Sequence, residues 1–78
     1  MVKKVFITGI GGLLGSTLAR RLLVKGGYTV AGCDTFIGGI KSNVPNNIEF
    51  HEIDILDTKK IKDAMKDTDV VFHTAALP

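Results

Sequence analysis

The chain has 78 residues, enough for one small domain with a modest core. Hydrophobic residues make up 45% and charged residues 23%, a composition that excludes a disordered chain. Scattered Lys and Arg residues give a net charge of +2, which excludes a nucleic-acid-binding tract, and no apolar stretch is long enough to span a membrane. The single cysteine, Cys33, has no disulfide partner, so we expect a reducing, cytoplasmic location.

The first third of the chain predicts a strand, a helix and a sharp stop. An apolar run of β-branched and aromatic residues predicts a buried strand over residues 3–8. Leucines that recur every four residues then predict an amphipathic helix over about 12–25. Two glycines, Gly26 and Gly27, end this helix because glycine accepts positive φ angles.

The rest of the chain continues the alternation of strand and helix. The expected elements are a strand from Tyr28 to Cys33, a loop over 35–47 with at most one helical turn, a strand at 48–51, a helix over about 58–66 and a strand beginning at Val70. Such alternation implies right-handed crossovers and a parallel sheet. We therefore predict an α/β fold, a partial Rossmann (doubly wound) parallel sheet with strand order 3-2-1-4.

Three glycines, Gly9, Gly12 and Gly15, lie three residues apart between the first strand and the first helix. Gly9 permits the tight turn, Gly12 lets the backbone approach a pyrophosphate, and Gly15 lets the helix pack close to the strand. The phosphates would then lie at the helix N-terminus. A bare turn before a helix is the alternative, but the acidic residue that ends the second strand favours dinucleotide binding.

Asp34 is that acidic residue, roughly 20 residues past Gly15. A carboxylate there accepts hydrogen bonds from both ribose hydroxyls of the adenosine half and repels a 2′-phosphate. No Arg or Lys stands at Ile10, Gly11 or Thr35 to neutralise such a phosphate. The sequence therefore favours NAD over NADP, and a solvated turn aspartate is the alternative interpretation.

Other polar residues carry weaker signals. Asp54 follows the third strand, where it is placed to bond the adenine amino edge while Ile55 packs on the ring; helix-start chemistry is the alternative, and we prefer it for Asp57. We interpret His51 as a surface residue and His73 as a packed structural residue. Neither histidine has a third ligand at metal-site spacing, so no metal site is predicted.

Together, Thr-Gly-x-x-Gly-x-x-Gly at 8–15, Asp34, Asp54-Ile55 and Val-Phe-His-Thr-Ala-Ala at 71–76 resemble the extended short-chain dehydrogenases/reductases. Among these, the chain is most similar to the NAD-dependent epimerase/dehydratase family of nucleotide sugars, which includes UDP-glucose 4-epimerase. All 78 residues take part in the resemblance. They correspond to the N-terminal part of an NAD-binding Rossmann domain.

The resemblance implies a role for each matching position. Gly9, Gly12, Leu13 and Leu14 would contact the pyrophosphate, Asp34 and Thr35 would hold the adenine ribose, Asp54 and Ile55 would frame the adenine, and Thr74, Ala75 and Ala76 would line the passage toward the nicotinamide ribose. It also implies NAD as cofactor and a nucleotide sugar as substrate of the intact enzyme. The family's Ser or Thr and its Tyr-x-x-x-Lys pair would lie beyond residue 78. Tyr28 has no lysine four residues on, so no catalytic residue is assigned and the chain alone is expected to be inactive.

Two other interpretations stay open: a non-catalytic NAD-binding module that senses or regulates, and a structural fragment that binds nothing. A downstream Tyr-x-x-x-Lys would favour the enzyme over the module. The fourth strand, Val70–His73, would have a neighbour in a complete sheet. Its apolar edge is therefore expected to cause self-association, whereas the third strand should stay unpaired.

Overall fold

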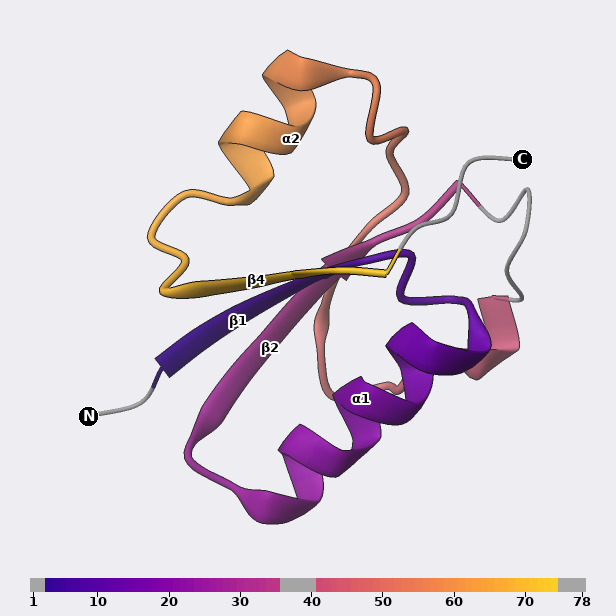
Figure 1. Ribbon diagram of the computed structural model, residues 1–78, viewed down its shortest axis with the longest axis vertical. Helices are drawn as coiled ribbons and strands as arrows, with labels where there is room; N and C mark the ends of the chain where they lie inside the picture. The colour runs from indigo at the N-terminus through magenta and orange to yellow at the C-terminus, as the bar shows by residue number, and fades with distance from the viewer. Residues whose placement is uncertain (1–2, 36–40, 75–78) are drawn as a thin grey trace.

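A computed structural model describes residues 3–35 and 41–74. Its elements are β1 (Lys3–Thr8), α1 (Leu13–Lys25), β2 (Tyr28–Cys33), the 3₁₀ turn η1 (Lys41–Asn43), β3 (Glu49–His51), α2 (Thr58–Ala64) and β4 (Val70–His73). The strands form one parallel sheet in the order β3-β2-β1-β4 (Figure 1). The predicted fold class and strand order are confirmed.

The helix α1 covers one face of the sheet and forms the larger part of the core. Val5 of β1 lies beside Val30 of β2, and both are buried with Ile7 and with Ala19 of the helix. Burying an aliphatic side chain of this size contributes about 1.5–3 kcal/mol. The strand pair β1–β2 and α1 therefore form the most firmly packed part of the chain.

The short helix α2 covers the opposite face (Figure 1). Phe6 of β1 and two residues of β2, Ala31 and Cys33, have no exposed surface there. Ala64 of α2 packs against them and is almost fully buried. Because successive strand residues point to opposite faces, Phe6 faces α2 while its neighbours Val5 and Ile7 face α1.

The helix ends differ slightly from the predicted ones, for local reasons. Asp57 caps α2 as predicted, with its Oδ1 accepting the Lys60 N–H at 3.2 Å. The helix ends at Ala64 rather than near 66, because Asp67 adopts a positive φ of 62° and turns the chain toward β4. After this turn, Asp69 Oδ2 accepts the Lys4 N–H at 2.8 Å.

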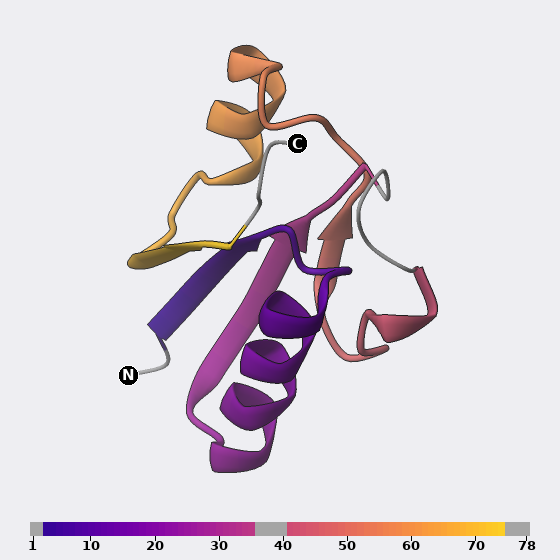
Figure 2. The same ribbon diagram turned by 45° about the vertical axis from the view of Figure 1, so that its right-hand side comes forward.

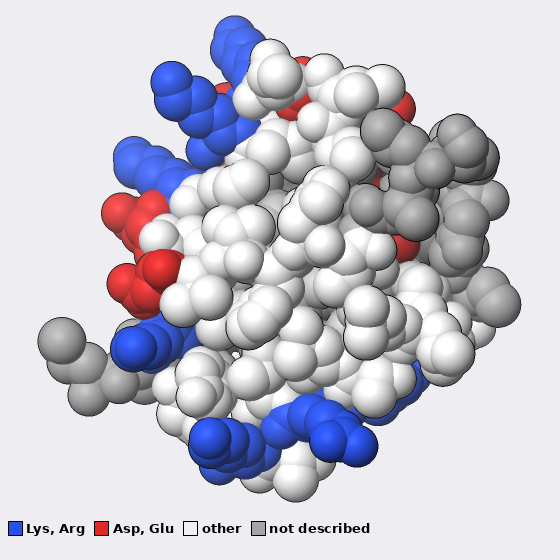
Figure 3. Space-filling view, in the orientation of Figure 1, with Lys and Arg blue, Asp and Glu red and all other residues white. Residues whose placement is uncertain are grey.

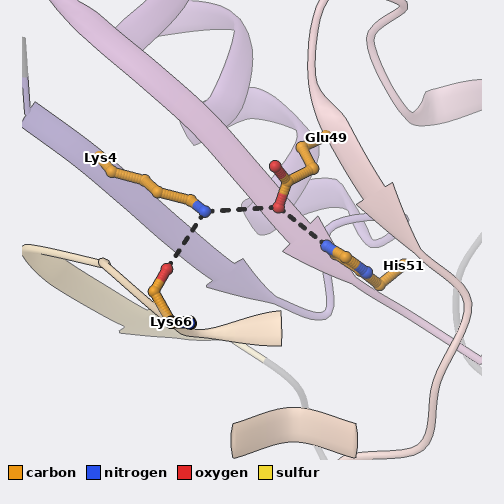
Figure 4. A network of polar contacts seen from close by, with 4 residues as sticks. All are labelled: Lys4, Glu49, His51 and Lys66. Atoms are coloured by element: carbon orange, nitrogen blue, oxygen red, sulfur yellow. Dashed lines mark hydrogen bonds and ion pairs between the residues drawn. The ribbon is translucent and has the colours of Figure 1, made fainter. Parts of the chain in front are cut away.

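A polar network crosses the sheet on the α2 face (Figure 4). Glu49 Oε2 on β3 lies 3.4 Å from Lys4 Nζ on β1 and accepts a hydrogen bond from His51 Nε2 at 2.9 Å. Lys4 Nζ also donates to the Lys66 carbonyl at 3.3 Å. The His51 hydrogen bond holds the pKa of Glu49 below its usual value. His51 is therefore a half-buried member of this network, and its ring lies beside Phe6.

Both edges of the sheet are open in the described residues, but they differ in chemistry. β3 carries Glu49 and His51 on one face, whereas the apolar Phe50 packs toward α1. β4 is more exposed: Val71 is 46% and Phe72 is 39% accessible. The alternation at the β3 edge agrees with its prediction as an edge strand.

We predict that the Cys33 thiol is protected from alkylation. Burial raises the pKa of Cys33 from 9.0 to about 11, so the thiol ionises at a higher pH in the folded chain than in the unfolded chain. At pH 8 iodoacetamide should react about 100-fold more slowly with the folded chain than with the urea-unfolded chain. The raised pKa also predicts that the free energy of unfolding falls as the pH rises above 9.0, the pKa of the unfolded thiol. Equal labelling rates in the two states would contradict this burial.

Candidate functional site

The loop between β1 and α1 lies at the carboxyl end of the sheet (Figure 2). It begins at Gly9, whose φ of 71° lies in the left-handed region that glycine adopts without steric cost. The N–H groups of Gly9 and Ile10 both donate to the Cys33 carbonyl, at 2.9 and 3.2 Å. This glycine loop, residues 9–12, is therefore fixed to the end of β2 and not only to β1.

Gly15 and Gly12 have different steric surroundings. A Cβ atom at Gly15 would collide with the Gly9 carbonyl oxygen and lie 2.8 Å from Thr74 Oγ1. A Cβ at Gly12 would lie 3.3 Å from the same carbonyl oxygen, which a small shift accommodates. Close packing of α1 on β1 therefore requires glycine at position 15, as the spacing of the glycines predicted. The packing of the fold would therefore tolerate a small side chain at position 12 more readily than at position 15.

The N-terminus of α1 has no side-chain cap. Gly12 occupies the N-cap position and has no side chain to accept the first N–H groups of the helix. Leu13 and Leu14, the first helical residues, are 83% and 69% exposed. First-turn N–H groups lack acceptors within a helix, and the helix dipole makes this end positive. The glycine loop therefore ends at a surface that favours an anion.

Asp34 lies directly against the glycine loop. Its Oδ2 accepts the Gly11 N–H at 2.7 Å, and its own N–H donates to the His51 carbonyl at 3.3 Å. Thr35, the next residue, is exposed. The structure thus brings the acidic residue at the end of β2 and the glycine loop together, by a contact that the sequence did not predict.

Two residues that sequence analysis did not single out complete this region. Asn43 Nδ2 of η1 donates to the Gly11 carbonyl at 3.1 Å. Arg20 Nη2 of α1 donates to the Asn43 carbonyl at 2.7 Å. A turn-forming asparagine and a helix-surface arginine give no individual signal. They become relevant only through their contacts, Asn43 with Gly11 and Arg20 with Asn43.

The end of β4 reaches the same region. Thr74 Oγ1 donates to the Thr8 carbonyl at 2.6 Å, and a hydrogen bond of 2.8 Å joins Thr8 Oγ1 to His73 Nδ1. His73 is exposed, so its interpretation as a packed residue was wrong, because β4 is an edge strand of the described sheet and all of its residues are exposed. Ala75 and Ala76 lie outside the described residues.

Asp54 and Ile55 follow β3 at the same end of the sheet. Asp54 Oδ1 accepts the Leu56 N–H at 2.9 Å, which makes a local turn. Ile55 packs against the buried cluster around Phe6 and Cys33. The Ile55 side chain is thus partly buried in the core, whereas Asp54 is exposed.

The described residues, 3–35 and 41–74, hold no group of three His, Cys, Asp or Glu side chains suited to a metal ion. Within the same residues, neither helix is long and apolar enough to cross a membrane.

Residues 5–78 match the sequence profile of the NAD dependent epimerase/dehydratase family. The chain belongs to this family. It is 39% identical over 80 residues to the UDP-N-acetyl-alpha-D-glucosaminuronate decarboxylase of Bacillus cytotoxicus, a match covering 99% of the chain and 25% of that protein. The chain thus spans about a quarter of the length of this relative.

Solved structures of other proteins share the fold. The Bordetella bronchiseptica enzyme WbmH in complex with NAD+ is 39% identical, with a TM-score of 0.91, and the match covers 100% of the chain and 27% of that enzyme. UDP-glucose 4-epimerase of Thermotoga maritima, solved with UDP-glucose, is 29% identical, with a TM-score of 0.88 over 94% of the chain and 24% of that enzyme. The family is NAD-dependent, which confirms the cofactor predicted from the sequence.

The two glycines should respond differently to alanine. We expect Gly15→Ala to lower the free energy of unfolding by about 1–3 kcal/mol, because the new Cβ meets a backbone carbonyl. This loss should appear even though Ala favours a helix interior by about 1 kcal/mol. Gly12→Ala should cost less than about 1 kcal/mol. Urea unfolding measures both, and a Gly15→Ala chain as stable as the wild type would contradict the close contact.

Proposed function

We propose that the chain is the NAD-binding segment of a nucleotide-sugar epimerase/dehydratase-type oxidoreductase. The observation that carries this proposal is the contact between the glycine loop and Asp34 beside the uncapped N-terminus of α1. This contact brings the Asp34 carboxylate close to a helix end whose free N–H groups favour an anion. Membership of an NAD-dependent family supports the same conclusion.

The pyrophosphate of NAD would lie at the start of α1. Gly12 leaves the N-cap position without a side chain, so a phosphate oxygen can take the place of a capping group. The backbones of Gly9, Leu13 and Leu14 would complete this subsite. The exposed Leu13 and Leu14 side chains flank it without any charge that opposes an anion.

The adenosine half would extend from the pyrophosphate toward the ends of β2 and β3. The Asp34 carboxylate would accept hydrogen bonds from the two ribose hydroxyls. Thr35, which is exposed, would lie beside the ribose. Asp54 and Ile55 would border the adenine. A 2′-phosphate at the ribose would meet the carboxylate of Asp34, so the site would select NAD over NADP.

The nicotinamide half would pass the end of β4. Thr74, with its hydroxyl on the Thr8 carbonyl, would stand beside this path, followed by Ala75 and Ala76. NAD, when bound, supplies a hydride acceptor and donor. The protein's own contribution in this chain is to bind and orient the cofactor.

We further propose that residues 1–78 are the N-terminal part of an NAD-binding Rossmann domain, and that the whole enzyme acts on a nucleotide sugar. The 78 residues contain no Tyr-x-x-x-Lys, so no acid–base group is assigned and the chain alone should not catalyse turnover. The unpaired, buried Cys33 thiol supports a cytoplasmic location.

The cofactor preference can be tested at Asp34. We expect the chain to bind NAD more tightly than NADP, and Asp34→Ala to weaken NAD roughly 5- to 150-fold, as loss of hydrogen bonds to a charged group predicts. Asp34→Asn keeps an acceptor for the Gly11 N–H but removes the charge. Asp34→Asn should therefore reduce the preference for NAD, so that the NAD and NADP dissociation constants become more similar. Isothermal titration calorimetry with both cofactors measures these values.

The matched control is Asp63→Asn, which removes one negative charge from the exposed surface of α2. It should leave both dissociation constants unchanged, so any general effect of net charge is separated from the effect at Asp34. Equal or tighter binding of NADP by the wild-type chain would overturn the role of Asp34. So would unchanged NAD binding by Asp34→Ala.

We also propose that β4 mediates pairing between two copies of the chain. Val70, Val71 and Phe72 are between 36% and 46% exposed, and among the residues that the structure describes β4 pairs only with β1. Figure 3 shows charged side chains over α2, along the left margin and over the lower end of α1, around an uncharged surface in the middle of the view. An apolar edge strand without charged residues is a template for another strand.

A lysine on this strand should prevent pairing. We expect the average mass of the wild-type chain to rise with concentration in light scattering, and Val71→Lys to hold it at the monomer value. Val24→Lys is the control, because Val24 is an 88% exposed valine on α1 and not on the strand edge. A monodisperse wild-type monomer at every concentration would contradict the proposal.

A further inference from the structure

The peptide group that joins Gly11 to Gly12 is hydrogen-bonded along both of its edges. Its carbonyl, on Gly11, accepts from Asn43 Nδ2 at 3.1 Å. Its N–H, on Gly12, donates to the Gly9 carbonyl at 3.0 Å. The neighbouring peptide is held as well, since the Gly11 N–H donates to Asp34. The middle of the glycine loop is therefore fixed by three partners.

These partners matter because two adjacent glycines do not define a backbone conformation by themselves. Glycine occupies positive and negative φ about equally well, so the peptide between Gly11 and Gly12 has alternative orientations of similar energy. Gly11 is buried, and a buried carbonyl without a partner is costly. Asn43 supplies that partner from a segment far along the chain. The orientation seen here therefore depends on Asn43.

Asn43 is itself held in place from α1. Its backbone carbonyl accepts from Arg20 Nη2 at 2.7 Å, a charge-assisted hydrogen bond. Arg20 lies on the same helix whose N-terminus follows Gly12. The glycine loop, η1 and α1 thus form a closed triangle of contacts. Arg20 and Asn43 form one side of this triangle, which we call the Arg20–Asn43 clamp.

We propose that Asn43 is a positioning residue for the dinucleotide, with Arg20 as its anchor. The clamp holds the Gly11–Gly12 peptide in the orientation that leads the chain into the uncapped N-terminus of α1. Because Gly11 also donates to Asp34, the clamp sets the pyrophosphate subsite and the ribose carboxylate relative to each other. This inference rests on the proposed NAD-binding function and adds a specific role for η1.

Two matched pairs of variants test the clamp by calorimetric titration of NAD. Asn43→Ala is compared with Asn46→Ala, an exposed asparagine three residues on, and Arg20→Ala with Arg21→Ala, the adjacent exposed arginine. We expect Asn43→Ala to raise the NAD dissociation constant about 3- to 10-fold, the effect of one ordinary hydrogen bond. Arg20→Ala should raise it less, because Asn43 keeps its own bond to Gly11. The two controls should bind as the wild type does, with the arginine pair equal in charge.

A second measurement needs no cofactor. Amide hydrogen exchange by NMR should show faster exchange of the Gly12 N–H in Asn43→Ala, with the Phe6 and Val30 amides of the core strands unchanged. If Asn43 only stabilised the whole fold, its loss would accelerate exchange of all three amides together. Faster exchange confined to Gly12 would therefore indicate a local role.

The two measurements separate the inference from the function on which it rests. A wild-type chain that does not bind NAD would refute the proposed function, whereas Gly12 exchange still reports on the clamp. Equal NAD binding by Asn43→Ala and Asn46→Ala would overturn the positioning role. Unchanged Gly12 exchange, or uniform acceleration across the core strands, would overturn it as well.

Discussion

The structure depends on the close approach of α1 to β1 at Gly15. With no side chain at this position, the helix backbone can lie against the Gly9 carbonyl and beside Thr74. That approach puts the start of the helix directly at the end of β1. A wider spacing would move the helix N-terminus, which we propose binds the pyrophosphate, away from the end of β1. The packing constraint therefore also sets the position of the proposed binding site.

A second glycine, Gly32 of β2, also allows a close contact, here between the glycine loop and the sheet. At Gly32 of β2, a Cβ would lie 2.5 Å from Ile10 Cδ1 and 2.6 Å from the Ile7 carbonyl. Ile10 therefore packs into the space that Gly32 leaves, and its side chain has no exposed surface. The loop is thus attached by an apolar side chain as well as by the hydrogen bonds to Cys33. Its one large side chain is buried, and its backbone is held by hydrogen bonds to neighbouring segments.

Features with a short sequence period were predictable, and features that join distant segments were not. β1, α1 and β2 follow from an apolar run, a four-residue repeat and paired glycines, and the strand order follows from their alternation. The placement of Asp34 followed from the position of the acid at the end of β2. The link from Asn43 to Gly11 spans 32 residues, and no periodicity encodes it. The exposure of His73 also depends on what covers β4, which local sequence does not state.

Most of the contacts that shape the glycine loop lie early in the chain. Gly9 and Ile10 bond to Cys33, and Gly11 bonds to Asp34 and Asn43, whereas Thr74 adds a longer hydrogen bond of 3.4 Å to the Gly9 carbonyl. Contacts of short sequence separation form quickly during folding. The glycine loop can therefore take shape within a β-α-β unit before β3, α2 and β4 are in place. During synthesis, this unit would be complete while residues 44–78 were still to be made.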